Sequence, residues 1–214
     1  MFSIYKSKVM SVSAMGATLA ALAFSTTSAA ATTLSTGLTQ NNGQRGIMFN
    51  IGTGSNALVL ESLETDFYSN TTADYEIYYT IGDFTAVQDT PSAWTLLDSL
   101  SGFTGTAGLQ SWDFADLLLP ANETIGLYVT NTSGGGIQYA DGSAVGSTLA
   151  TDGNLTIFGG VGRSYAFGDT FSPRDFVGSL DYSVASVPLP AGGLLLLTSM
   201  GGFAAFKRRK KHDA

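Results

Sequence analysis

Short segments in which apolar and polar residues alternate run through the middle of this 214-residue chain. The clearest are residues 47–51 (IMFNI) and 124–131 (TIGLYVTN). Because successive side chains of a strand point to opposite faces of the sheet, this period of two predicts half-buried β-strands. The side chains expected to face the core are Ile47, Phe49, Ile51, Ile125, Leu127 and Val129.

Other apolar runs recur at about 10-residue spacing between stretches rich in Gly, Ser, Asn and Asp, which predicts about eight to ten strands. The further strands expected are residues 57–67, 75–81, 94–97, 109–114, 117–119, 136–139, 154–158 and 174–184. In the last of these, Phe176, Leu180 and Tyr182 are expected to share one face. Helical periodicity over ten residues occurs only in the two terminal segments. The pattern predicts an all-β domain over residues 32–186, a jelly-roll-like β-sandwich, flanked by an N-terminal signal helix and a C-terminal transmembrane helix.

The first 31 residues have the parts of a secretion signal. Lys6 and Lys8 supply positive charge, and residues 9–24 are uncharged and apolar or small. Small residues then permit cleavage after Ala30 or Ala31. Since the apolar stretch is shorter than the ~20 residues that span a bilayer, the sequence favours removal of residues 1–31 over a retained anchor.

The last 28 residues, 187–214, place a proline-rich motif before an uncharged apolar stretch and an unbroken run of cations. The motif is Val187, Pro188, Leu189, Pro190 and Ala191, and the cations are Lys207, Arg208, Arg209, Lys210 and Lys211. Cations after an apolar helix stay on the cytoplasmic side of a membrane, so they act as a stop-transfer signal. The apolar stretch of about sixteen residues is just short of the usual ~17–25, which predicts a thin or transient crossing.

This tail resembles the PEP-CTERM sorting signal, in its VPLPA variant, of exopolysaccharide-producing Gram-negative bacteria. The resemblance implies that an exosortase recognises the proline-rich motif, cuts near it and releases the protein to the outer envelope or matrix. Leu189 stands where the commoner form has Glu, which leaves the subtype of processing enzyme open. Residues 189–193 (LPAGG) also resemble the LPxTG sortase signal, but Gly192 replaces its Thr. A permanently anchored single-pass protein is the third alternative.

The region between the two ends resembles an uncharacterised β-sandwich module of other PEP-CTERM-tailed and secreted bacterial proteins. The resemblance spans most of the domain and implies no reaction. It rests on Trp94, Leu119, Pro120, residues 127–130 (LYVT), Tyr139, Leu155, Ile157, residues 171–174 (FSPR), Phe176, Gly178 and residues 180–182 (LDY).

The expected domain is strongly acidic. Only three of the ten basic residues, Arg45, Arg163 and Arg174, lie within it, against sixteen of the seventeen acidic residues, which gives a formal charge of −13. Nucleic-acid binding relies on Lys and Arg, so this balance argues against a nucleic-acid partner. The chain has no cysteine and its one histidine is His212, so carboxylates are the usual catalytic bases that remain to the domain.

Three residues are candidate ligand contacts: Arg174, Tyr139 and Asp141. Arg174 can bind a carboxylate or sugar hydroxyls through its planar fork, although pairing with a domain carboxylate is the favoured interpretation. Tyr139, with Tyr78, Tyr128 and Trp112, could stack on sugar rings, but at 11% aromatic content most such residues should fill the core. Asp141 and Asp152 each precede a glycine. Together they could supply oxygen ligands for Ca²⁺, but the ordinary Asp-Gly turn is the favoured interpretation.

These observations favour a non-enzymatic exported protein of the cell surface or extracellular matrix, associated with exopolysaccharide or biofilm. The expected partners are the export machinery, an exosortase-type enzyme, the membrane through the C-terminal helix, and polysaccharide; no cofactor or metal is predicted. A carbohydrate-binding module, with or without help from Ca²⁺, is the second hypothesis. A glycan-cleaving enzyme is the third, because two carboxylates suffice for that reaction and no motif selects a pair.

Overall fold

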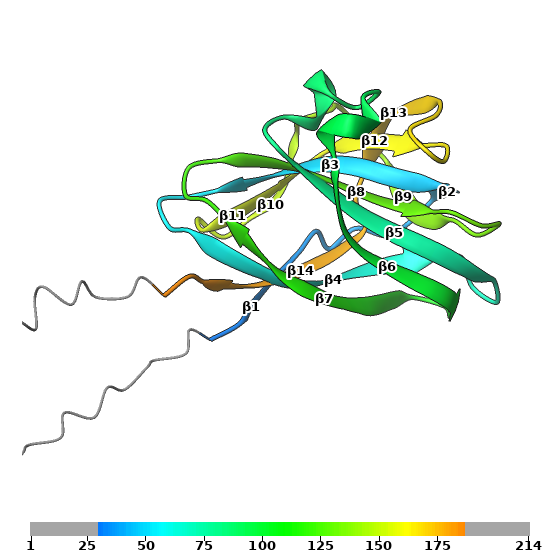
Figure 1. The fold of residues 1–214 in the computed structure, drawn as a ribbon, viewed down its shortest axis with the longest axis horizontal. Coiled ribbons are helices and arrows are strands. Elements are labelled where there is room, and N and C mark those ends of the chain that lie inside the picture. The colour runs from blue at the N-terminus through cyan, green and yellow to red at the C-terminus, as the bar shows by residue number, and fades with distance from the viewer. Residues whose placement is uncertain (1–29, 187–214) are drawn as a thin grey trace, which may run out of the picture.

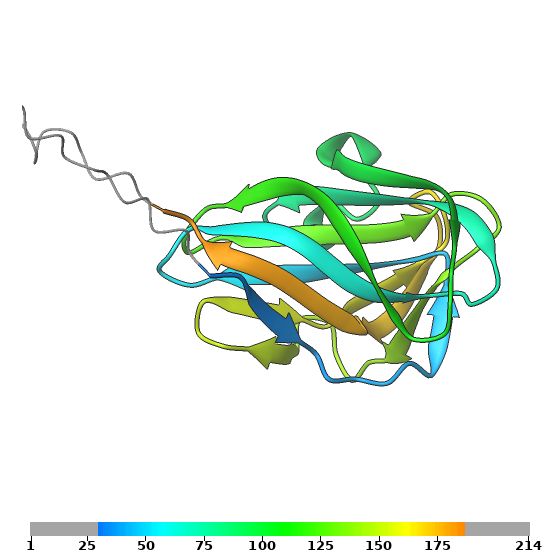
Figure 2. The same ribbon diagram turned by 90° about the horizontal axis from the view of Figure 1, so that it is seen from below.

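The computed structural model describes residues 30–186, which form fourteen β-strands and two short 3₁₀ helices. Every pairing between strands is antiparallel. The predicted all-β class is therefore confirmed for this part of the chain. The strands form two layers that face each other across one apolar core (Figure 1, Figure 2).

Sheet A contains β1, β14, β4, β7, β9 and β2, with β4 at its centre between β7 on one side and β14, continued by β9, on the other. Its strands span Thr32–Ser35 (β1), Asn42–Gln44 (β2), Leu58–Phe67 (β4), Leu109–Leu119 (β7), Ile137–Asp141 (β9) and Gly178–Val184 (β14). β1 and β14, blue and orange, lie side by side in both ribbon views.

Sheet B runs in the order β10, β11, β3, β8, β5, β6, and β12 shares with β11 the same side of β3. Its strands span Gly46–Thr53 (β3), Thr72–Ile81 (β5), Thr95–Thr104 (β6), Thr124–Asn131 (β8), Thr148–Thr151 (β10), Leu155–Phe158 (β11), Gly160–Arg163 (β12) and Thr170–Asp175 (β13). β13 pairs with β12 and also with β9, and so joins the two sheets.

The core between the sheets contains the side chains that the alternation predicted. Ile47, Phe49 and Ile51 of β3 and Ile125, Leu127 and Val129 of β8 are all fully buried there. From sheet A come Leu180 and Tyr182, and the Phe176 ring stacks on that of Phe49 with centroids 4.4 Å apart. The predicted inward faces are confirmed.

Strand β3 is buried on both of its faces. Met48 points away from the main core and joins a second apolar cluster with Phe84, Trp94, Tyr128 and Val161. The 3₁₀ helices Phe84–Ala86 (η1) and Pro91–Ala93 (η2) lie in the segment that supplies Phe84 and Trp94 to this cluster. This segment therefore keeps the outer side of β3 from water.

Several predicted boundaries were wrong. The strand expected at 94–97 continues to Thr104, and the two expected at 109–114 and 117–119 form the single strand β7. The single strand expected at 174–184 is the end of β13 followed by β14, with Phe176 in the corner between them. The short strands β1, β2, β10 and β12 were not predicted.

The predicted signal segment, residues 1–31, lies outside the described residues except for Ala30 and Ala31. The sorting motif and basic run of residues 187–214 also lie outside them. Within residues 30–186 the structure contains no helix that is long and apolar enough to span a bilayer.

Candidate functional site

The structure brings the three candidate ligand contacts together at the junction of the sheets. Arg174 on β13 is the direct register partner of Asp141 on β9, two residues after Tyr139. The Arg174 Nη1 atom lies 3.5 Å from Asp141 Oδ1. The guanidinium carbon lies 5.9 Å from the centre of the Tyr139 ring.

The contacts of Arg174 are structural. Its Nη1 also donates to the Pro173 carbonyl at 2.6 Å, and its buried Nε has no partner in the described structure. Burial raises the pKa of the Tyr139 hydroxyl, and the neighbouring Arg174 charge acts in the opposite direction. Since Tyr139 is only 1% exposed, it offers no ring face to a sugar. The trio thus pins β13 to β9, as the favoured interpretation of Arg174 expected.

The aromatic residues considered as a sugar platform do not form one. Trp112 and Tyr128 are buried, like Tyr139. Only Tyr78 is partly exposed; its hydroxyl donates to Glu76 at 2.6 Å, and its ring packs against those of Tyr128 and Phe167. Burial, and next the Glu76 carboxylate, raise the pKa of Tyr78. Three of the four thus fill the core, as expected for most of the aromatic residues.

The two Asp-Gly sequences have different roles. Asp152 lies in the hairpin turn between β10 and β11, where its Oδ1 accepts from the backbone N–H groups of Asn154 and Leu155 at 3.0 Å. Asp141 ends β9, and its Oδ1 accepts from the Asn42 side chain at 2.7 Å. The turn interpretation is confirmed at Asp152. The turn interpretation was wrong at Asp141. A hairpin turn there would join β9 to the next strand, β10, but these two strands do not pair.

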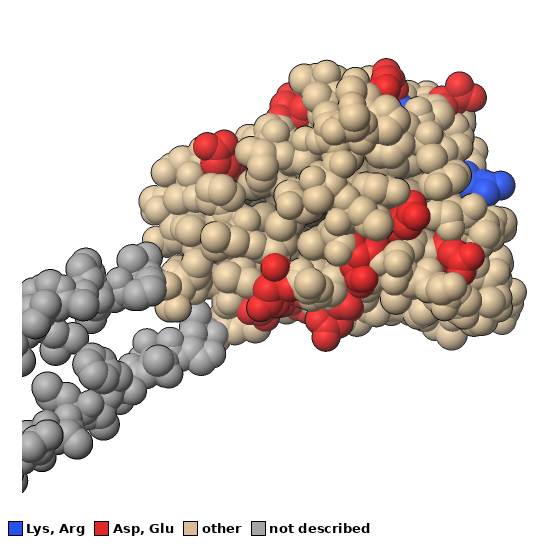
Figure 3. All heavy atoms as spheres, viewed as in Figure 1, with Lys and Arg blue, Asp and Glu red and all other residues tan. Residues whose placement is uncertain are grey.

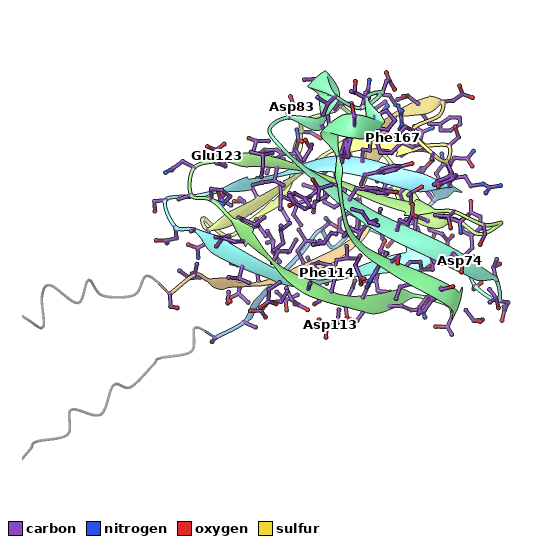
Figure 4. All side chains as sticks on the ribbon, viewed as in Figure 1. Asp74, Asp83, Asp113, Phe114, Glu123 and Phe167 are labelled. Atoms are coloured by element: carbon purple, nitrogen blue, oxygen red, sulfur yellow. The ribbon has the colours of Figure 1, made fainter. Side chains whose placement is uncertain are left out.

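A hollow with polar walls lies on the outer face of sheet A. This acidic groove has a volume of about 450 Å³. Its lining residues are Ala31, Thr33, Glu61, Ser62, Ser111, Asp113 and Asp181. Figure 3 shows acidic side chains gathered near β7 with very little basic surface in view, and Figure 4 shows Asp113 pointing out from that strand.

Strand register builds this groove. Thr33, Asp181, Ser62 and Asp113 are successive cross-strand partners on β1, β14, β4 and β7. Ser62 donates to Asp181 at 2.8 Å, and Thr33 donates to the other oxygen of the same carboxylate. A shift in register at Leu60/Ser62 allows Glu61 and Ser62 to line the groove together.

The groove offers hydroxyls and three carboxylates, and no basic side chain lines it. Such a surface suits hydrated neutral or cationic material and repels anions. The groove was not predicted from the sequence. The sequence pattern that could have indicated it is the alternation around Asp113. Its neighbours Trp112 and Phe114 are buried, so Asp113 has to face outward.

One carboxylate outside the groove was also not predicted. Asp175, the last residue of β13, is 8% exposed, and its Oδ1 has no hydrogen-bond partner in the described structure. Burial raises the pKa of this carboxyl group. No group of three or more His, Cys, Asp or Glu residues within 30–186 is arranged to hold a metal ion.

Comparisons with known proteins give no family. No protein-family model matches the chain, and no curated protein resembles it. Among solved structures, the infectious bursal disease virus VP2 subviral particle matches with 12% identity and a TM-score of 0.27, over 74% of this chain and 42% of that one. The infectious bursal disease virus Gx strain matches with 11% identity and a TM-score of 0.26, over 75% and 37%. The chain thus spans well under half of these capsid chains, and a likeness this small supports no inference about its function.

Proposed function

We propose that this protein is an exported, non-enzymatic component of the cell surface or extracellular matrix, sorted by an exosortase-type system and associated with exopolysaccharide. In this proposal residues 1–31 are removed on export, and the 187–191 motif is the processing site. The β domain, which we infer to be a jelly-roll-like sandwich, is the part that remains in the polysaccharide layer.

The observation that carries the proposal is the position of the domain's two ends. Thr32 at the start of β1 pairs with Tyr182 near the end of β14, so both ends of the domain lie at the same end of the molecule (Figure 1). A tail anchored in a membrane beyond residue 186 would then hold the domain at one end. The opposite end and the two sheet faces would stay free to meet the surrounding matrix.

The acidic groove supports the same proposal. Ala31 lines it, so cleavage after Ala30 would leave the new amino terminus beside Glu61, Asp113 and Asp181. The mature domain would then begin with a cation next to these three carboxylates.

The test is fractionation of the native host, with both termini of the protein mapped by mass spectrometry. We expect a product in the matrix that begins at Ala31 or Thr32 and ends near Pro190. A full-length tail in the inner membrane would contradict the sorting step and leave a permanently anchored protein.

A second candidate function is carbohydrate binding, favoured by the open groove of hydroxyls and carboxylates, because carboxylates accept strong hydrogen bonds from sugar hydroxyls. We expect the protein to be retained on the host's own polysaccharide, and the double variant Glu61→Gln/Asp113→Asn to be retained less. The control is Glu123→Gln, on an exposed acid outside the groove. Equal elution of all three proteins with the void volume would eliminate this candidate.

A further inference from the structure

Asp175 is a buried acid whose Oδ1 atom has no hydrogen-bond partner within residues 30–186. The two ion pairs within residues 30–186 join Arg163 to Asp89 and Arg174 to Asp141, so Asp175 is in neither. Its neighbour Arg174 is committed to Asp141 and Tyr139. An ionised carboxylate out of water needs a compensating charge or hydrogen bonds, and otherwise takes up a proton.

Other oxygen atoms converge beside this carboxylate. A β-carbon placed on Gly159 would lie 2.7 Å from Asp175 Oδ1, 2.8 Å from the Ala144 carbonyl oxygen and 2.8 Å from Ser147 Oγ. Three oxygens therefore surround one point next to the Gly159 backbone. A β-carbon position is too close to the Gly159 Cα for an ion. A bound ion would lie farther from this Cα, on the side where the three oxygens converge.

The backbones of two glycines pack closely against this carboxylate. A β-carbon on Gly142 would also lie 2.7 Å from Asp175 Oδ1. The loop that runs from Gly142 to Ser147 is held against Gly159 by two backbone hydrogen bonds, Gly146 N–H to Gly159 O at 2.8 Å and Gly159 N–H to Ser147 O at 2.7 Å. Two of the three oxygens, those of Ala144 and Ser147, thus come from a loop whose position is already fixed.

We propose that Asp175 Oδ1, the Ala144 carbonyl oxygen and the Ser147 hydroxyl bind a divalent cation of the Ca²⁺ class. Carboxylate, carbonyl and hydroxyl oxygens are the ligands that Ca²⁺ takes, with water completing its shell. Mg²⁺ requires a stricter octahedron, and the site has no nitrogen or sulfur donor for zinc. The bound cation compensates the Asp175 charge and ties the 142–147 loop to β13.

A single carboxylate gives a weak site. Ca²⁺ sites with few charged ligands bind in the range of about 10⁻⁴–10⁻³ M, which is typical of extracellular modules. The domain charge of −13 raises the local concentration of cations around it.

The test uses the full-length protein in detergent micelles, with Ca²⁺ alone as the probe. Calorimetric titration and thermal unfolding are compared for the wild type, Asp175→Asn, Ser147→Ala and the control Asp141→Asn, all stripped first with EDTA. We expect the wild type to bind one Ca²⁺ and to unfold at a higher temperature with millimolar Ca²⁺. Asp175→Asn should lose both effects, Ser147→Ala should bind about tenfold more weakly, and Asp141→Asn should keep both.

Asp175→Asn removes a buried charge and keeps the side-chain shape, so it should fold; Ser147→Ala provides an independent variant. No Ca²⁺ effect on the wild type, or the same effect in Asp175→Asn, would overturn the proposal. A wild type that is indifferent to Ca²⁺ but gains stability on acidification, a gain absent in Asp175→Asn, would show that a proton occupies the place assigned to the cation.

Discussion

Asp152 shows how one carboxylate organises a turn and a core residue together. Burial raises the pKa of Asp152, but hydrogen bonds from the Leu155 N–H, the Tyr182 hydroxyl and the Asn154 N–H outweigh it, so the pKa lies below its usual value. Burial, and next the hydrogen bond to Asp152, raise the pKa of Tyr182 to about 12. The Tyr182 ring lies in the main core, so the contact fixes the β10–β11 hairpin to β14.

Replacing Tyr182 by Phe should lower the free energy of unfolding by about 1–2 kcal/mol at neutral pH, because a hydrogen bond to a charged group is lost. A depressed folded-state pKa of Asp152 contributes stability that is present above the unfolded pKa and lost as pH falls through the folded value. The deficit of Tyr182→Phe should therefore shrink in acid. Urea unfolding at several pH values measures it.

The matched control is Tyr79→Phe, at a partly buried tyrosine with no side-chain hydrogen bond in the described structure. It should cost much less than Tyr182→Phe and show no such pH dependence. Equal losses for the two variants would mean that the hydroxyl contact at Asp152 contributes nothing.

At the scale of elements, β3 pairs with other strands on both edges and is buried on both faces. On one edge it pairs with β8, and on the other with β11 and β12. β12 approaches so closely that a β-carbon on Gly160 would lie 1.9 Å from the Met48 carbonyl oxygen. Only glycine fits there, because backbone atoms cannot move aside as a side chain can.

Gly160→Ala should lower the free energy of unfolding by about 3 kcal/mol, the upper part of the range for overpacking. The control is Gly52→Ala on β3, where the added carbon would meet the edge of the Phe158 ring at 3.1 Å and the ring can shift. That change should cost less than about 1 kcal/mol. Denaturant midpoints of the two variants measure the difference, and similar midpoints would argue against the close approach of β12 to β3.

Elements differ in how well their sequences predicted them. β3 and β8 were predicted with the correct faces because each has one side against the core. β12 (GVGR) has no alternation to detect, since two of its four residues are glycines placed for close approach. β13 and β14 were merged into one strand because Phe176 continues the apolar pattern through the corner that separates them.

At the scale of the whole molecule, charge is the dominant property. Within residues 30–186 two arginines, Arg163 and Arg174, form ion pairs, and most of the sixteen acids have no cationic neighbour. Such a net charge destabilises the compact state through self-repulsion.

We therefore expect the free energy of unfolding to rise as NaCl is increased from about 10 mM to about 150 mM, since the screening length falls from ~30 Å to ~8 Å. Urea titrations at fixed pH measure this. Glu61→Gln/Asp113→Asn, which removes two groove carboxylates, should reduce the salt dependence. Stability that is flat or falls with salt would show that repulsion among the acids is insignificant.

The sequence by itself determined the all-β class, the inward faces of the main strands and the excess of acids, because alternation and composition are local properties of the chain. It also indicated Arg174, Tyr139 and Asp141 as candidate ligand contacts, and these three side chains lie next to one another in the structure. Only the tertiary structure decided that Tyr139 is buried, that β1, β14, β4 and β7 align their polar residues into a groove, and that Asp175 faces the oxygens of a distant loop. These depend on pairings between residues up to about 150 positions apart, as with Thr33 and Asp181, and strand register across such distances is set by the packing of the whole core.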